Sequence, residues 1–268
     1  MAILQRIVIA FLTVAMLTTS AVQAASTTNF SDNWYIENQA GWGMLVQQQT
    51  DVLFIGLFVY GADNKPTWFT ATAFYQSNSV SGHVVFTGDL YRTNGTYYGA
   101  TWNSAALGYT KVGTLTFDAA TTNDATLTYS VDGTQVVKNV TRQTWRYENL
   151  SGKYSGSWIN DYDSCGPNRH DESIMIDIAH NADNTIMLSF SSREGWWFDL
   201  YGTYSQSGHI GKIVGSVDYP GTWYFTFSEI EKSTAGFTGR IDAVTRYFSG
   251  NVMHTCVTTN GRIAVARQ

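Results

Sequence analysis

Two glutamates near the end of one predicted strand come closest to the spacing of a catalytic pair. Glu229 and Glu231 are two positions apart, and residues two apart on a strand share a face at about 6.5–7 Å. That distance falls at the lower end of the range that separates the two catalytic carboxyl groups of inverting glycosidases. The alternative is a solvated strand face beside Lys232, and catalytic pairs usually come from different strands. The pair therefore supports a hydrolase only as a secondary hypothesis.

A second acidic cluster has part of the skeleton of a calcium loop. Asp161, Asp163, Gly166 and Glu172 stand at positions 1, 3, 6 and 12 of that pattern. Position 5 is Cys165, however, and no helices are predicted on either side. We therefore expect an acidic surface loop and no metal, with Asp161, Asp163 and Glu172 as weak candidate ligands.

Aromatic residues are the most abundant material for a binding site, with 9 Trp, 16 Tyr and 14 Phe. Such side chains line pockets or platforms for apolar ligands and sugar rings, although they also fill the cores of small barrels. Adjacent tryptophans must point to opposite faces of a strand. We expect the site in the C-terminal half, and the candidate ligand-binding residues are Trp42, Trp68, Trp158, Trp196, Trp197 and Trp223.

Cys165 and Cys256 are the only cysteines. In an exported chain two thiols usually form a disulfide. Closing a loop of about 90 residues removes on the order of 4–5 kcal/mol of denatured-state entropy. We therefore predict a Cys165–Cys256 disulfide that stabilises the C-terminal half.

Common catalytic and cofactor motifs do not occur in the sequence. The five histidines are scattered, and there is no Gly-x-Ser-x-Gly elbow, phosphate loop or dinucleotide glycine pattern. We expect no cofactor, and an enzyme is the less favoured hypothesis.

Alternation of apolar and polar residues runs through both halves and predicts strands with one buried face. Leu127, Tyr129 and Val131 alternate with threonine and serine, and Asp132-Gly133 then predicts a tight hairpin. Later strands are expected over residues 248–257 and 261–267. Glycines inside the strands favour curled sheets. The predicted fold is all-β, with two tandem small antiparallel β-barrel-like or sandwich domains after a signal peptide.

Residues 1–24 have the features of a secretory signal peptide. Arg6 precedes an apolar run of 11 residues, Ile7 to Leu17, and Val22-Gln23-Ala24 fits a cleavage site. The sequence then divides near residues 146–151, which predicts an N-terminal domain over residues 25–147 and a C-terminal domain over residues 148–268. We expect a secreted or periplasmic protein.

The charge balance bears on partners. Without residues 1–24 the chain has 15 basic and 21 acidic side chains and a net charge of −6. A net acidic chain argues against nucleic acid and anionic membranes. No later segment has 18 consecutive apolar residues, so we expect no integral membrane segment. The oligomeric state is left open.

Motifs in the first half resemble a family of uncharacterised secreted bacterial β-domains. The resemblance covers about residues 33–145 and implies an exported bacterial protein with no transferable activity. In the second half, Gly156-Ser157-Trp158 is similar to the first strand of lipocalin-like and avidin-like barrels. The motifs of the first half are Gly41-Trp-Gly43, Gln47-Gln-Gln49, Phe58-Val-Tyr-Gly61, Pro66-Thr-Trp-Phe69, Gly88-Asp-Leu-Tyr-Arg92, Asp132-Gly133 and Thr141-Arg-Gln143.

The function that these observations favour is non-catalytic binding by an exported protein. Its partner would be a small-molecule or glycan ligand, apolar or saccharide, held by aromatic side chains. The alternatives are an extracytoplasmic hydrolase of envelope or extracellular polymer and a structural or adhesive surface module.

Overall fold

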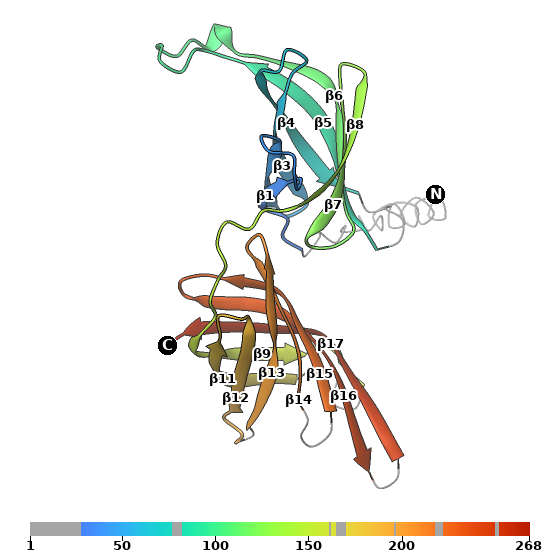
Figure 1. Ribbon diagram of the computed structural model, residues 1–268, viewed down its shortest axis with the longest axis vertical. Helices are drawn as coiled ribbons and strands as arrows, with labels where there is room; N and C mark the ends of the chain where they lie inside the picture. Colours follow the sequence, from blue (N-terminus) through green and yellow to red (C-terminus); the bar gives the residue numbers. More distant parts are fainter. Residues whose placement is uncertain are drawn as a thin grey trace, which may run out of the picture.

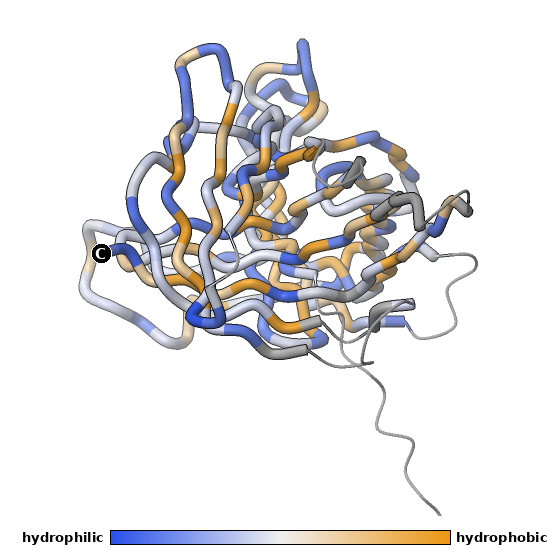
Figure 2. Tube along the Cα trace, turned by 90° about the horizontal axis from the view of Figure 1, so that it is seen from below, coloured by the Kyte–Doolittle hydropathy of each residue, from blue (hydrophilic) through white to orange (hydrophobic). Residues whose placement is uncertain are grey.

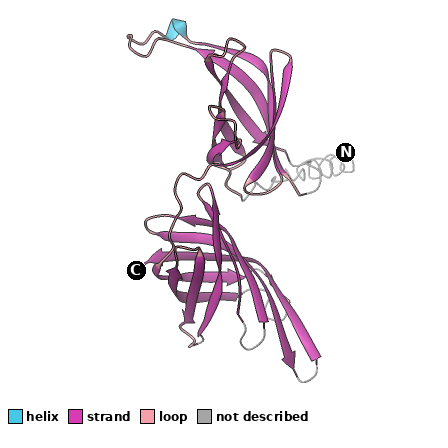
Figure 3. Cartoon of the chain, viewed as in Figure 1, coloured by secondary structure: helices cyan, strands magenta, loops and turns pink. Residues whose placement is uncertain are grey.

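The chain folds into two closed antiparallel β-barrels of eight strands each (Figures 1 and 3). The computed structural model describes residues 28–76, 82–160, 162–164, 170–195, 197–217, 222–249 and 252–268. Over these ranges the one helix is a short 3-10 turn, η1 (Ser104–Ala106). The predicted all-β fold is therefore confirmed, and the barrel rather than the sandwich is the form that it takes.

The first barrel is a simple meander in which each strand pairs with the next. It closes because β1 also pairs with β8, through Trp34 opposite Arg142 and Tyr35 opposite Thr141. Its strands are β1 (Asp32–Tyr35), β2 (Gly43–Gln49), β3 (Val52–Tyr60), β4 (Pro66–Tyr75), β5 (Val84–Asn94), β6 (Gly108–Ala119), β7 (Asp124–Val131) and β8 (Thr134–Arg142).

The second barrel closes by the pairing of its last strand, β17, with its first, β9. The short strand β10 pairs with an earlier stretch of β17, at Thr258 and Thr259. The strands are β9 (Gly152–Asn160), β10 (Tyr162–Asp163), β11 (His170–His180), β12 (Thr185–Ser192), β13 (Trp197–Ser207), β14 (Ile210–Val217), β15 (Thr222–Lys232), β16 (Gly236–Ser249) and β17 (Val252–Arg267).

Period-2 alternation places one set of side chains inside each barrel and the other set outside. Along β7, Ala125, Leu127 and Tyr129 are buried, whereas Thr126 and Thr128 are partly exposed. Apolar and polar residues alternate in this way along many strands (Figure 2). The buried side chains form two separate clusters, one in each barrel, so each barrel has its own core.

The hairpin predicted at Asp132-Gly133 is confirmed. Strand β7 ends at Val131 and β8 begins at Thr134. Both turn residues have positive φ, 49° at Asp132 and 87° at Gly133. A two-residue turn of this kind matches the right-handed twist of the strands that it joins.

The break predicted between strands over residues 248–257 and 261–267 is wrong, and residues 248 and 249 belong to β16. The structure has one continuous strand, β17, of 16 residues. Asn-Gly is a sequence that favours a tight turn, but at Asn260-Gly261 the strand continues because Gly261 pairs with Ile241 of β16, with a register shift between Ile241 and Ala243. A glycine inside a strand marks this irregularity rather than a strand end.

Both barrels begin with the same arrangement of an apolar residue and an aromatic side chain four positions later. Phe30 is 1% exposed and Leu150 is 0% exposed, and each belongs to the core of its barrel. The Trp34 Nε1–H donates to the Phe30 carbonyl at 3.1 Å, and the Tyr154 hydroxyl donates to the Leu150 carbonyl at 2.8 Å. The lead-in to the first strand thus caps each core.

An arginine near the end of the last strand completes the arrangement in both barrels. Arg142 of β8 donates from Nη1 to the Ser31 carbonyl at 3.2 Å, and Arg267 of β17 donates from Nη2 to the Ser151 carbonyl at 3.4 Å. In each case the arginine ties the last strand to the residue after the apolar cap. The two barrels therefore share a closing device that their sequences do not make obvious.

The predicted disulfide involves Cys165, which lies outside the described residues, so it stays a prediction. Hydrogen bonds nevertheless join the residues next to the two cysteines. The Ser164 N–H donates to the Val257 carbonyl at 3.1 Å, and the Val257 N–H donates to the Ser164 hydroxyl at 2.8 Å. These two residues are the sequence neighbours of Cys165 and Cys256.

We expect mass spectrometry of the exported protein to find Cys165 and Cys256 joined. Cys256→Ser should then lower the melting temperature of the second barrel by removing up to about 4–5 kcal/mol of loop-closure stabilisation, with little effect on the first barrel. Two free thiols in protein that was never reduced would contradict this prediction.

Candidate functional site

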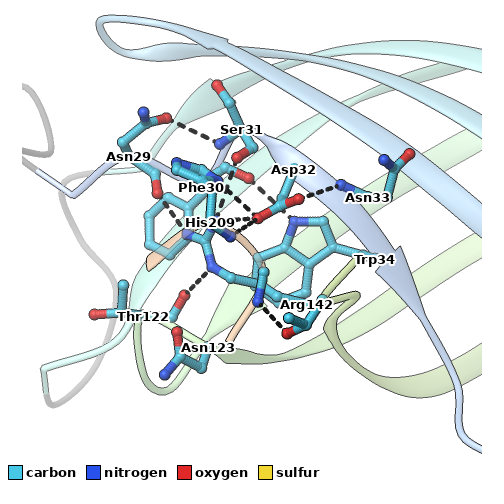
Figure 4. Close-up of polar contacts among 12 residues, drawn as sticks. Asn29, Phe30, Ser31, Asp32, Asn33, Trp34, Thr122, Asn123, Arg142 and His209 are labelled. Atoms are coloured by element: carbon cyan, nitrogen blue, oxygen red, sulfur yellow. Dashed lines mark hydrogen bonds and ion pairs between the residues drawn. The ribbon is translucent and has the colours of Figure 1, made fainter. Parts of the chain in front are cut away.

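Among the described residues, an extensive polar cluster surrounds Arg142, at the end of the first barrel that meets the second (Figure 4). Its side chain is 0% exposed. Nε donates to the Thr122 carbonyl at 2.8 Å, Nη1 to the Ser31 carbonyl and to Asp32, and Nη2 to the Asn29 carbonyl. Its guanidinium also lies 5.0 Å from the Trp34 ring centroid. Burial lowers the pKa of Arg142, although the nearby carboxylate of Asp32 opposes that effect.

Asp32 connects this cluster to the second barrel. Its Oδ2 accepts from the backbone N–H of His209 at 3.0 Å and lies 2.7 Å from Nδ1 of the same residue. Burial raises the pKa of Asp32, but the hydrogen bonds from His209 outweigh it and leave that pKa below its ordinary value. The contact depends on Gly208, with φ of 58°, where a Cβ would collide with the Asp32 carboxylate.

The linker between the barrels is held on the same turn, between β13 and β14. The Gly208 N–H donates to the Thr144 hydroxyl at 2.9 Å. Gln206 donates to the Arg146 carbonyl at 2.8 Å and accepts from the Glu148 N–H at 2.7 Å. The N–H groups of Arg142 thus donate to backbone carbonyls and to Asp32. The cluster therefore has a structural role, as the joint between the barrels.

Glu229 and Glu231, the secondary catalytic hypothesis, lie on β15, where the pairing with β16 shifts register between Ser228 and Glu231. Glu229 has a φ of 51°, so the regular-strand spacing assumed for the pair does not apply. The Thr28 hydroxyl donates to Glu229 at 3.4 Å. Both carboxylates raise the pKa of Arg142, after burial and Asp32 in importance. The structure thus assigns them a place in the charge balance of the joint.

A groove of about 360 Å³ crosses the outer face of the second barrel, over β9, β11, β12 and β13. Of the aromatic residues that line it, Tyr154 and Phe190 are buried in the core, and Trp197 is 75% exposed. Trp197 is directly opposite Ser191, which is opposite Met175, itself 51% exposed. These residues form one cross-strand row of the groove.

The neighbouring row is polar. Asp199 is opposite Ser189, which is opposite Asp177, which is opposite Lys153. The Lys153 Nζ and an Asp177 carboxylate oxygen are 3.8 Å apart, and both side chains are mostly exposed. An indole face therefore lies beside a line of carboxylate, hydroxyl and ammonium groups. That combination can stack on one face of a ring and hydrogen-bond to the substituents around it.

The structure does not bring Trp42, Trp68 or Trp158 into this groove. Trp158 packs against the core, with its ring 6.2 Å from that of Phe190. Trp42 is partly buried against the first core, and Trp68 is 50% exposed on the outer face of β4. Trp196 lies outside the described residues. Trp223 is in β15.

Of the three candidate calcium ligands, Asp163 is in β10 and Glu172 is in β11, whereas Asp161 lies outside the described residues. Within the part of the chain that the structure describes, no three His, Cys, Asp or Glu residues are placed to hold a metal ion.

The loop between β5 and β6 presents a second aromatic surface, which the sequence analysis did not single out. This hairpin extends away from the barrel (Figure 1). Its signal in the sequence is a stretch without charge between Arg92 and Lys111. The exposed fractions are 64% for Tyr97, 94% for Tyr98, 67% for Trp102 and 73% for Tyr109.

Hydrogen bonds within the loop hold this surface in one conformation. The Thr96 hydroxyl donates to the Asn103 carbonyl and accepts from the Asn103 N–H, both at 2.9 Å. The Asn94 side chain donates to the Ala106 carbonyl at 3.0 Å, and Asn103 caps η1 by accepting from the Ala105 N–H. The aromatic rings are thus exposed on a loop that is already ordered.

The chain matches no protein-family model, no curated protein and no solved structure. The resemblance of residues 33–145 to secreted bacterial β-domains therefore rests on its motifs alone. No helix among the described residues has the length and hydrophobicity needed to cross a bilayer.

The lowered pKa of Asp32 predicts a pH-dependent stability. Its contribution is complete above the ordinary pKa of 3.8 and is lost as the pH falls through the lowered value. We expect Asp32→Asn to lower the free energy of unfolding by about 1–3 kcal/mol at neutral pH. On acidification below about pH 4, the free energy of unfolding should fall less in this variant than in wild type. Denaturant unfolding at three pH values measures both effects.

The matched control is Asp63→Asn, which replaces an exposed carboxylate in the β3–β4 turn. It should keep the acid sensitivity of the wild type. Parallel stability curves for Asp32→Asn and wild type would show that the Asp32–His209 contact does not stabilise the joint.

Proposed function

We propose that the protein is an exported, non-catalytic binding protein for an uncharged saccharide. The observation that carries the proposal is the outer-face groove of the second barrel, in which Trp197 lies beside Asp177 and Asp199. Export is supported by the signal-peptide features of residues 1–24. The proposal names Trp197 as the stacking residue and the two carboxylates as hydrogen-bond acceptors for ring hydroxyls.

The polar lining favours a saccharide over an apolar ligand. An apolar molecule would desolvate Asp177, Asp199 and Lys153 without giving them hydrogen-bond partners, and that desolvation is costly. A sugar ring has an apolar C–H face for the indole and hydroxyls for the polar row. Its stacking would bury on the order of 100 Å² of apolar surface, worth about 2.5 kcal/mol before the costs of association.

We propose binding without catalysis because the carboxylates near Trp197 are open to solvent. Asp177 and Asp199 are on β11 and β13, separated by Ser189 of β12. Both are solvent-accessible, and their outer-face position gives them no enclosed site from which water is excluded. Catalytic electrostatics depend on such exclusion, so binding is the activity that this groove supports.

Surface adhesion is a second candidate function, favoured by the ordered aromatic loop between β5 and β6. Tyrosine and tryptophan with serine, asparagine and glycine form the recognition surfaces of many binding loops. The loop has this composition and holds Tyr98 and Trp102 in solvent. It would attach the protein to an uncharged surface of the cell envelope.

For the saccharide proposal, we expect a panel of neutral oligosaccharides to contain a ligand whose affinity falls at least about tenfold in Trp197→Ala. Isothermal titration calorimetry of the ligand found by array screening gives the affinity. Trp145→Ala is the control, because Trp145 is similarly exposed, at 72%, but lies in the linker. Absence of any oligosaccharide ligand, or binding that survives Trp197→Ala, would defeat the proposal.

For the adhesion candidate, we expect the protein to co-sediment with purified cell-envelope material and the double variant Tyr98→Ser, Trp102→Ala to do so at least about tenfold more weakly. Tyr147→Ser is the matched control, since Tyr147 is 68% exposed in the linker. Equal sedimentation of the loop variant and wild type would contradict a role for this loop.

A further inference from the structure

We propose that the outer wall of the first barrel over β2, β3 and β4 is the interface of a homodimer, in which it packs on the same wall of a second copy. This inference does not depend on the proposed saccharide site, which belongs to the other barrel. It rests on one contiguous apolar surface, defined as the β2–β4 wall by the outward side chains of Leu45, Phe54, Phe58, Tyr60, Trp68 and Phe74.

The strand register makes this wall continuous. Phe58 is directly opposite Trp68. Leu45 is opposite Gly56, the residue between Phe54 and Phe58 on the outer face of β3, so its side chain lies diagonal to both phenylalanines. Gly56 has no side chain of its own, and the Phe58 ring lies near its backbone. The register thus places the apolar side chains as neighbours on one face of three strands.

The exposure of these side chains is what requires explanation. Phe54 is 46% exposed, Phe58 52%, Trp68 50% and Phe74 54%. All point outward, because the residues between them, such as Leu53, Ile55 and Phe69, are in the core. Isolated exposed apolar residues are normal, but a contiguous patch marks an interaction site.

The wall on the opposite side of the same barrel has another composition. The outward residues of β6 and β7 are mainly threonine, with Thr114, Thr116, Thr126 and Thr128 in the same alternating positions. The outer surface is therefore apolar over β2, β3 and β4 and mainly polar over Thr114–Ala119 of β6 and over β7. A barrel that stood alone would gain nothing from that division.

The area of the β2–β4 wall suits a dimer. Half-exposed side chains of this size present about 100 Å² each, or on the order of 600 Å² together. That is the upper limit for the largest patch on a typical monomer, and most of the roughly 800 Å² that each partner contributes to a standard interface. The rest of the interface area would come from polar residues interspersed among them, such as Gln47, Thr70 and Thr72.

Charge selects a second copy over other partners. The strands β2 and β3 contain no charged residue, and neither does β4. A surface that meets itself about a two-fold axis places each residue near its own copy, so an uncharged wall avoids like-charge repulsion. The chain is otherwise acidic, with a net charge of −5, which disfavours anionic lipid as the partner.

The test is sedimentation velocity of the chain beginning at Ala25, over a range of concentrations, with three variants. Wild type should be a dimer. Phe58→Glu and Trp68→Glu should weaken dimerisation at least about tenfold, because each buries a charge against its own copy. Thr128→Glu, on the polar wall, should leave the dimer unchanged.

Circular dichroism melting checks that the variants are folded, which we expect because the substituted side chains point outward. A wild-type monomer at every concentration would overturn the proposal, and so would a dimer that both Phe58→Glu and Trp68→Glu leave intact. Association that occurs only in the chain with residues 1–24 attached would also overturn it, since the contact would then belong to that segment. Binding of the monomer to zwitterionic vesicles in place of dimerisation would assign the wall to lipid instead.

Discussion

The buried guanidinium of Arg142 is the interaction on which the architecture of the first barrel and its joint depends. From the end of β8 it reaches the carbonyls of Asn29 and Ser31 before β1, and the turn at Thr122. It therefore closes the barrel and holds Phe30 as the cap of the core. Through Asp32 it also fixes the position of His209, and with it the second barrel. Removing one member of such a buried network leaves other polar groups without partners, which costs more than the pair itself contributes.

Barrel closure also decides where binding can occur. In each barrel the inward half of the alternating residues forms a hydrophobic cluster, so side chains such as Trp158 serve packing. The outward residues of the same strands remain for recognition. Trp197 and the β2–β4 wall are products of this division, and the aromatic loop adds a third outer surface between β5 and β6. Function in this protein is accordingly proposed for outer surfaces, and the two barrels provide separate ones.

Much of the fold could be predicted because alternation and turn chemistry are local properties. The all-β class and the hairpin at Asp132-Gly133 follow from such patterns. The length of β17 could not be predicted, because Asn260-Gly261 is a turn signal that only pairing with β16 overrides. Arg142 lies within the Thr141-Arg-Gln143 motif, yet its role depends on carbonyls about 110 positions away in the chain. For the site, adjacency predicts that Trp196 and Trp197 face opposite ways but does not say which of them faces outward. Asp199 lies two positions from Trp197 on β13, so alternation alone predicts that they share a face, whereas Asp177 joins them only through the register of β11, β12 and β13.

The central claim, that ligand binds outside a packed barrel, can be tested directly by NMR of the tryptophan indole N–H groups. Resonances are assigned with single Trp→Phe variants and followed during titration with the oligosaccharide identified by array screening. We predict that the Trp197 indole signal shifts in proportion to binding while the Trp158 signal stays in place. A shift of Trp158 with Trp197 unmoved would place the ligand inside the barrel and contradict the account.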